Sequence, residues 1–365
     1  MEHFSNQTKQ GLQATPSFFS RHKWRILAGL GVGVVLGISG YLYTVGALPF
    51  FDRAPVLPTA HGTLYFTGAT SDHPVPNVYL YDLDRGNFEL GQGVFTNEAY
   101  ARYTTAFSPS GREIAYFNAI AADSSGAPSE PTVLASTLQL IRFSVNDPSQ
   151  FDVRTPDAPS FKIYPQWSPD GQSILYEAYV GEDGGFADIN NWAVYRIDGV
   201  GKEVRIVHGS SPQWSPDGAS FLYVGEDGVY RYDVATASSS MAVPLLEPAH
   251  WGATRIDLTP DGTTLVVSAE TKRIERYRIT AWDPFTYELN DTVNREHVRH
   301  WWPQVSRDGS QIAAIDWEQV ADGDTNYQAS LVVYGKATET SPYQVIASTT
   351  LSEFDLMAKY LSDWR

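Results

Sequence analysis

Residues 322–326 have the types and spacing of a cation-binding segment. Asp322, Asp324 and Asn326 alternate with Gly and Thr, and alternating carboxylate and amide oxygens open the loops that hold calcium, a hard cation that prefers oxygen ligands. The match has two departures: Tyr327 stands where such loops have Gly, and Val333 stands where they have a bidentate Glu. The sequence therefore offers one candidate calcium site, with an ordinary acidic turn as the alternative, and it predicts no other cofactor.

Other chemistry finds little support in the residue types. The chain has no Cys, which excludes disulfides, thiol catalysis and Cys-ligated zinc. His297 and His300 are three residues apart, which does not fit the i, i+4 spacing of a helical histidine pair. The small Gly-rich stretch 37–40 lies within an apolar segment and is not the Gly-x-Ser-x-Gly of a nucleophile elbow. We therefore expect a protein that is not an enzyme.

A repeated turn motif shows which elements must position any site. Five copies of one pattern end in glycines that are 60, 47, 44 and 47 residues apart: Phe107-Ser-Pro-Ser-Gly111, Trp167-Ser-Pro-Asp-Gly171, Trp214-Ser-Pro-Asp-Gly218, Leu258-Thr-Pro-Asp-Gly262 and Val305-Ser-Arg-Asp-Gly309. Pro and Gly suit the corners of a tight hairpin, and we expect the Asp residues to stabilise these turns and not to take part in catalysis or binding. A weaker copy around Gly62 brings the count to six units. Units of about 40–50 residues with several strands each are typical of propeller blades.

Apolar residues fall at the third and fifth positions after each of these glycines. Alternation with a period of two predicts a strand with one buried face. The pairs are Ile114 and Tyr116, Ile174 and Tyr176, Phe221 and Tyr223, Leu265 and Val267, and Ile312 and Ala314. We expect an all-β protein, a six-bladed β-propeller over residues 54–350.

The aromatic-Ser-Pro-Asp-Gly element resembles the repeats of the TolB-like, WD40-like propeller family. The resemblance covers residues 54–350 and implies a fold rather than a function. TolB proteins carry an α/β domain ahead of the propeller, and the propeller peptidases carry a hydrolase domain. This chain has no room for either, so the resemblance transfers no functional residue.

The N-terminal 60 residues predict a membrane anchor. Residues 26–48 contain no charge and are long enough to cross a bilayer as a helix. Arg21, Lys23 and Arg25 precede this segment, so the positive-inside rule predicts a cytoplasmic tail at 1–25, a linker at 49–60 and a propeller in the periplasm or outside the cell. A cleaved signal peptide, with small residues at 45–47, is the alternative. Gly29, Gly33 and Gly37 line one helix face and suggest a helix partner, although glycine is common in membrane helices.

The C-terminal residues 351–365 have apolar side chains on one side of a helical wheel. Ser352 and Asp355 also approximate a helix-start box. We therefore expect a C-terminal amphipathic helix. A strand that closes the propeller ring is the alternative, because closure removes exposed sheet edges.

The acidic residues concentrate in the expected loops between the second and third strands of the blades. The chain has 42 Asp and Glu against 26 Lys and Arg, a net charge of −16, which argues against nucleic acid as a partner. The candidate binding-face residues are Asp123, Glu130, Glu182, Asp183, Asp188, Glu226 and Asp227. Such a rim suits a cationic ligand or a basic protein surface, and a merely solvated surface is the alternative.

These observations favour a membrane-anchored extracytoplasmic propeller that binds a protein partner on its rim, as a scaffold or accessory subunit of a cell-envelope assembly. The rival function is an enzyme or a binder of small molecules or glycans at the axis of the propeller. Carboxylates that converge at the axis would favour the rival, and an axis filled by aliphatic side chains would reject it.

Overall fold

The computed structural model describes most of the chain beyond residue 57. The described residues are 58–68, 70, 77–90, 100–110, 113–120, 136–142, 149–153, 161–181, 185, 187–198, 201–269, 273–295, 298–319, 327–351 and 360–364. They belong to the compact unit Leu57–Arg365. The predicted tail, membrane helix and glycine face all lie outside the described residues. Within them, no helix has the length and apolar character that a bilayer crossing requires.

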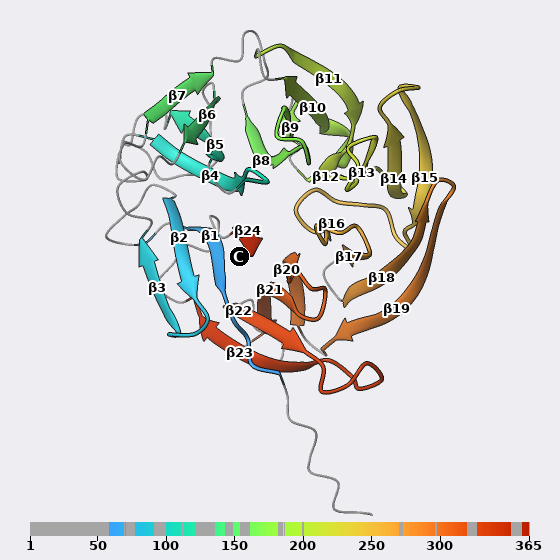
Figure 1. Cartoon of the computed structure of the whole chain (residues 1–365). Helices are drawn as coiled ribbons and strands as arrows, with labels where there is room; N and C mark the ends of the chain where they lie inside the picture. Colours follow the sequence, from blue (N-terminus) through green and yellow to red (C-terminus); the bar gives the residue numbers. More distant parts are fainter. Residues whose placement is uncertain are drawn as a thin grey trace, which may run out of the picture. The chain divides into compact units, whose positions relative to one another are not determined.

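The described strands form six four-stranded antiparallel sheets arranged around a common centre (Figure 1). We number the sheets I to VI in chain order. Sheet I contains β24 (Tyr360–Trp364), β1 (Thr63–Gly68), β2 (Asn77–Asp82) and β3 (Asn87–Leu90). Sheet II contains β4 (Tyr100–Phe107), β5 (Glu113–Ile120), β6 (Ser136–Arg142) and β7 (Ser149–Val153). Sheet III contains β8 (Lys162–Trp167), β9 (Ser173–Tyr179), β10 (Trp192–Asp198) and β11 (Glu203–His208).

The remaining three sheets have the same serial order of strands. Sheet IV contains β12 (Ser210–Trp214), β13 (Ser220–Val224), β14 (Gly228–Asp233) and β15 (Ser238–Pro244). Sheet V contains β16 (Arg255–Leu258), β17 (Thr264–Ala269), β18 (Arg273–Trp282) and β19 (Phe285–Asn294). Sheet VI contains β20 (Val298–Val305), β21 (Ile312–Gln319), β22 (Tyr327–Gly335) and β23 (Gln344–Thr350). One 3₁₀ turn, η1 (Ile189–Asn191), is the only helical element of the described part. The all-β propeller predicted from the repeats is thus confirmed.

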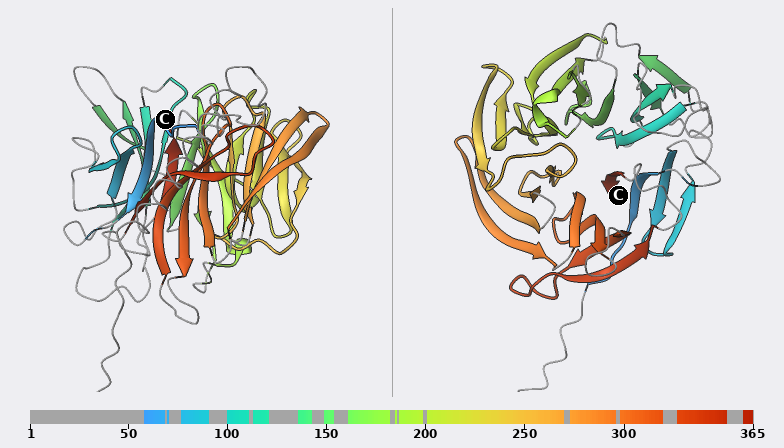
Figure 2. Two further views of the ribbon diagram at one scale, coloured as in Figure 1. Left: turned by 90° about the horizontal axis from the view of Figure 1, so that it is seen from below. Right: turned by 180° about the vertical axis from the view of Figure 1, so that it is seen from behind.

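The repeated motif joins the first and second strands of sheets II to VI, as the sequence predicted. In sheet III, for example, Ser168–Gly171 lies between β8 and β9. Because the strands alternate in direction, the described turns of the motif and the described turns between third and fourth strands gather on one side, which we call the hairpin face. The described connections between second and third strands, such as 225–227 in sheet IV, and the described connections between sheets, such as 245–254, lie on the opposite side, the loop face (Figure 2).

The expected C-terminal helix over 351–365 is wrong for the residues that the structure describes there. Tyr360–Trp364 form β24, which pairs antiparallel with β1 and is the first strand of sheet I. Without β24, the N–H and C=O groups on the inner edge of β1 would be unpaired. Pairing β1 with β24 removes this exposed sheet edge. A helical pattern over so short a segment does not outweigh the pairing that closes the ring.

Both faces of the second strands are buried, whereas the sequence predicted one. All ten predicted core residues are buried, but so are residues between them, such as Ala115, Leu175, Leu222, Val266 and Ala313. Each sheet is packed between two neighbours, so both faces of its second strand are covered there and the alternation of buried and exposed residues is lost, whereas outer strands such as β15 stay largely exposed.

The strands nearest the centre carry a repeated bulge. Thr104, Tyr164, Ser211 and Trp302 occupy equivalent positions in β4, β8, β12 and β20, and all have positive φ, from 35 to 57°. The register of each strand shifts at this point. Residues at the bulges form hydrogen bonds between adjacent sheets, as where Tyr164 N of sheet III donates to Thr104 Oγ1 of sheet II at 2.7 Å. Strand bulges commonly re-aim side chains next to functional sites.

Candidate functional site

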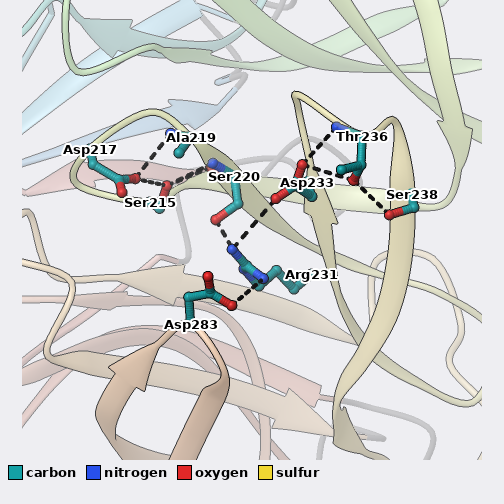
Figure 3. A network of polar contacts seen from close by, with 9 residues as sticks. All are labelled: Ser215, Asp217, Ala219, Ser220, Arg231, Asp233, Thr236, Ser238 and Asp283. Atoms are coloured by element: carbon teal, nitrogen blue, oxygen red, sulfur yellow. Dashed lines mark hydrogen bonds and ion pairs between the residues drawn. The ribbon is translucent and has the colours of Figure 1, made fainter.

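The aspartates of the repeated hairpins act within the turns. Asp217 Oδ1 accepts hydrogen bonds from Ser215 Oγ at 2.6 Å and from Ala219 N at 3.0 Å (Figure 3). The Ser215 hydroxyl is the main cause that lowers the pKa of Asp217, followed by the Ala219 N–H. Asp170 makes equivalent bonds with Ser168 and Gln172. These carboxylates are committed to fixing the hairpins, as the sequence analysis expected.

A second polar group joins the hairpins of neighbouring sheets on the same face. Arg231 of β14 donates through Nε to Ser220 Oγ at 3.2 Å. Its Nη2 lies 3.8 Å from Asp233 Oδ2, and its Nη1 lies 4.0 Å from Asp283 of sheet V (Figure 3). This arginine thus links the hairpins of sheets IV and V.

The loop face carries an acidic cavity of about 680 Å³ between sheets III and IV. Glu226 and Asp227 from the β13–β14 turn and Glu247 from the β15–β16 connection line it, together with Leu246. The side chain of Leu246 is 82% exposed, the largest value among the exposed large apolar residues of the described part. The cavity thus joins three carboxylates to an exposed apolar side chain, which suits a basic surface that also presents an apolar residue.

Backbone bonds hold the walls of this acidic cavity in place. Ala249 N donates to Glu226 O at 2.7 Å, and Leu245 N donates to Asp227 O at 3.0 Å, so the turn and the connection form one structure. The hydroxyl of Tyr230 donates to Asp227 Oδ1 at 2.6 Å. That bond raises the pKa of Tyr230 to about 12, with burial as the second cause. Of the two carboxylates on the turn, Asp227 is therefore already bonded within the protein.

The structure places three of the seven predicted binding-face residues near each other. Asp188 caps η1 by accepting from Asn190 N at 2.9 Å, and its backbone pairs with His250, which lies in the same β15–β16 connection as Glu247. Glu226 and Asp227 line the cavity itself. The other four, Asp123, Glu130, Glu182 and Asp183, lie outside the described residues, as do Asp322, Asp324 and Asn326 of the calcium candidate. Among the residues that are described, no group of three metal-ligating side chains comes together.

A second cavity, of about 590 Å³, opens where the inner strands of sheets II to VI reach the hairpin face. Gln166, Gln213 and Gln304, at equivalent positions of three sheets, line it, and Asp257 occupies the same position in sheet V. Asp257 Oδ2 accepts from Val305 N at 2.8 Å. Besides these amides and Asp257, the axial cavity is lined by Asp261, by Arg307 and by aromatic, proline and aliphatic side chains such as Trp167, Trp214 and Leu258, so polar and apolar groups share it.

A buried ion pair lies next to the glutamines of this cavity. Arg255 donates to Glu177, which also accepts from Trp251 Nε1 at 2.8 Å, and both charged side chains are almost fully buried. The Arg255 guanidinium lies 4.3 Å from the ring centre of Trp302 and 4.4 Å from that of Tyr164. Burial raises the pKa of Glu177, and the charge of Arg255 opposes that rise.

Neither the residues at the axis nor Glu247 were among the site residues predicted from the sequence. One signal was present for the amides: Pro-Gln precedes the motif three times, at Gln166, Gln213 and Gln304. Nothing in the sequence pairs Glu177 with Arg255, since they lie 78 residues apart on different sheets.

Comparison with known proteins finds solved structures that are similar to this chain only at low sequence identity. No family model and no curated protein matches the chain. Among solved structures, a protein assigned as TolB from Agrobacterium tumefaciens is 17% identical, covering 80% of this chain and 90% of that one, with a TM-score of 0.47. A periplasmic gluconolactonase from Pseudomonas aeruginosa is 14% identical over 83% and 98%, with a TM-score of 0.48.

A third neighbour is the β-propeller domain of Cps50 (Swd1) from Myceliophthora thermophila. It is 13% identical, covering 82% of this chain and 88% of that domain, with a TM-score of 0.47. Likeness at this level assigns no family and no activity, and fold alone does not imply function.

Proposed function

We propose that this chain is a membrane-anchored scaffold whose six-bladed propeller lies outside the cytoplasm and binds a basic protein segment on its loop face. The observation that carries the proposal is the acidic cavity, which is lined by the carboxylates of Glu226, Asp227 and Glu247 and by the exposed side chain of Leu246. The uncharged stretch at 26–48 supports the anchor, and the positive-inside rule supports the orientation.

Charge and shape give this cavity a specific kind of partner. The partner must bring Lys or Arg to the carboxylates and an apolar side chain to Leu246. Contacts of this kind between exposed charges set orientation and encounter rate, and salt weakens them. The net charge of −16 argues against a nucleic acid as the partner.

A photo-crosslinking amino acid in place of Leu246 tests the docking surface in the full-length chain within its native membranes. We expect a discrete adduct with one protein, whose yield falls at high salt. The double variant Glu226→Lys and Glu247→Lys should abolish the adduct, since both carboxylates lie in the cavity and neither is bonded to Tyr230. The matched control reverses two charges on the hairpin face, Asp283→Lys and Glu339→Lys, and should leave the adduct intact. An adduct that survives the first pair, or disappears equally with the second, would contradict the proposal.

The absence of Cys allows a direct test of location. Single cysteines are introduced at Thr340, an exposed position in the β22–β23 turn, and at Ser5 in the N-terminal tail. A membrane-impermeant maleimide should label Thr340→Cys in intact cells or spheroplasts and Ser5→Cys only after lysis. The opposite pattern would place the propeller in the cytoplasm and overturn this part of the proposal.

A further inference from the structure

Arg255 presents hydrogen-bond donors that its known partners do not use. The side chain is buried, with a relative exposure of 2% for the residue, and Nη1 donates to Glu177. The Nε and Nη2 atoms are buried without a hydrogen-bond partner among the described residues. A buried cationic donor left without a partner is costly, so it is rare unless something outside the chain binds it.

The two unused donors lie on the same edge of the guanidinium group. The N–H of Nε and one N–H of Nη2 are parallel by covalent geometry, and this edge matches the two oxygens of a carboxylate. The faces of the group are covered by Tyr164 and Trp302, whose ring centres lie 4.4 and 4.3 Å from the central carbon of the guanidinium. Aromatic faces hold a guanidinium in one plane and leave its edge as the place where a planar anion can bind.

A small cavity at Arg255 connects this chemistry to the axial cavity. It has about 20 Å³, and Arg255, Tyr164 and Trp302 are among the residues that line it. Gln166, Gln213 and Gln304 line both this small cavity and the larger one of about 590 Å³, so the two are adjacent. The small cavity has room for one or two polar atoms, and the large one has the size of a small-molecule site.

We infer that the axial cavity binds a small carboxylic acid with a polar, uncharged body, whose carboxylate pairs with the Nε and Nη2 edge of Arg255. The body lies among the glutamine amides, which offer both donors and acceptors, in a cavity that Asp257, Asp261 and Arg307 also line. The ligand enters from the hairpin face, opposite to the protein-docking surface, so this site goes beyond the proposed scaffold function and does not depend on it.

Three six-membered-ring compounds separate the parts of this inference. Binding to the full-length chain in detergent is measured by calorimetry at constant ionic strength and followed by the fluorescence of Trp302 and its neighbours. D-glucuronate carries both the carboxylate and the hydroxyls, D-glucose lacks the carboxylate, and cyclohexanecarboxylate lacks the hydroxyls. We expect glucuronate to bind at least 10-fold more tightly than either of the others. Equal binding of glucose, or no binding of glucuronate, would overturn the inference and leave ordered water as the occupant.

A substitution away from the ion pair keeps the test independent of folding. Gln304→Glu places a carboxylate in the cavity, where it repels the ligand and competes for Arg255, and should weaken glucuronate binding at least 10-fold. The matched control, Gln172→Glu, makes the same change at an exposed position beside a hairpin and should leave binding unchanged. Binding that resists Gln304→Glu would show that glucuronate is held elsewhere. Arg255→Lys, which loses the parallel edge but keeps the charge, should also bind at least 10-fold more weakly.

Discussion

The buried pair of Glu177 and Arg255 makes a quantitative prediction about stability. Removing one partner leaves the other charge inside the protein, because Glu177 has a relative exposure of 0% and Arg255 of 2%. Breaking a buried pair in this way costs about 3–5 kcal/mol. We therefore expect Glu177→Gln and Arg255→Met each to lower the free energy of unfolding by about that amount.

The double variant distinguishes a paired charge from general damage to the core. Glu177→Gln with Arg255→Met leaves no charge, and the Gln oxygen still accepts from Trp251. Replacing both partners of a buried pair by neutral groups is often close to neutral, so we expect the double variant to lose less than either single one. The two substitutions should thus be coupled by at least about 3 kcal/mol.

The dependence on pH gives a second signature in Arg255→Met. Burial raises the pKa of Glu177, and the variant removes the cation that opposes this rise. A carboxyl whose pKa is higher in the folded than in the unfolded state favours the folded state at low pH. The variant should therefore be least impaired below about pH 4, near the unfolded pKa of Glu, and should lose stability as the pH rises through the folded pKa.

Urea unfolding of the full-length chain in detergent, followed by tryptophan fluorescence, measures these quantities. The exposed pair of Arg278 and Glu288 is the matched control, with side-chain exposures of 63% and 60%. The same cycle on that pair should give less than about 1 kcal/mol of coupling. Coupling as small at Glu177 and Arg255, with single losses below about 1 kcal/mol, would refute the reasoning.

Two further predictions concern the turns. Gly209→Ala should lower the free energy of unfolding in urea by about 3 kcal/mol, because Gly209 has φ of 134° and an added Cβ would collide with the carbonyl oxygen of Val224. Gly171→Ala should lower it by only about 1–2 kcal/mol, because φ is 70° there and no atom lies within 4 Å of the added Cβ. Equal losses of stability in the two variants would contradict this prediction. Asp217→Asn should make the free energy of unfolding less sensitive to acid. The pKa of Asp217 is lowered in the folded state, so the stability that this carboxylate contributes is lost as the pH falls through the folded pKa. If the free energy of unfolding of the variant and of the original protein fell in parallel between pH 5 and pH 2, this prediction would be wrong.

Local chemistry in the sequence determined the repeats and the turns of this protein. Pro and Gly at fixed spacing set the hairpins, and apolar alternation after each Gly located the second strands, because these preferences act within a few residues. Tertiary packing then changed the details. Ala115 and Leu175 are buried against expectation, since each sheet is covered on both faces by neighbouring sheets.

The C-terminus and the axis depended on tertiary structure alone. A helical pattern at 360–364 yields to pairing with β1, because the open edge of sheet I is created by residues some 300 positions earlier in the chain. Glu177, Arg255 and the three glutamines come together only when sheets III to VI pack around the axis. The sequence by itself determined what each unit is, and the packing of units far apart in the chain decided where charge is buried and where cavities open.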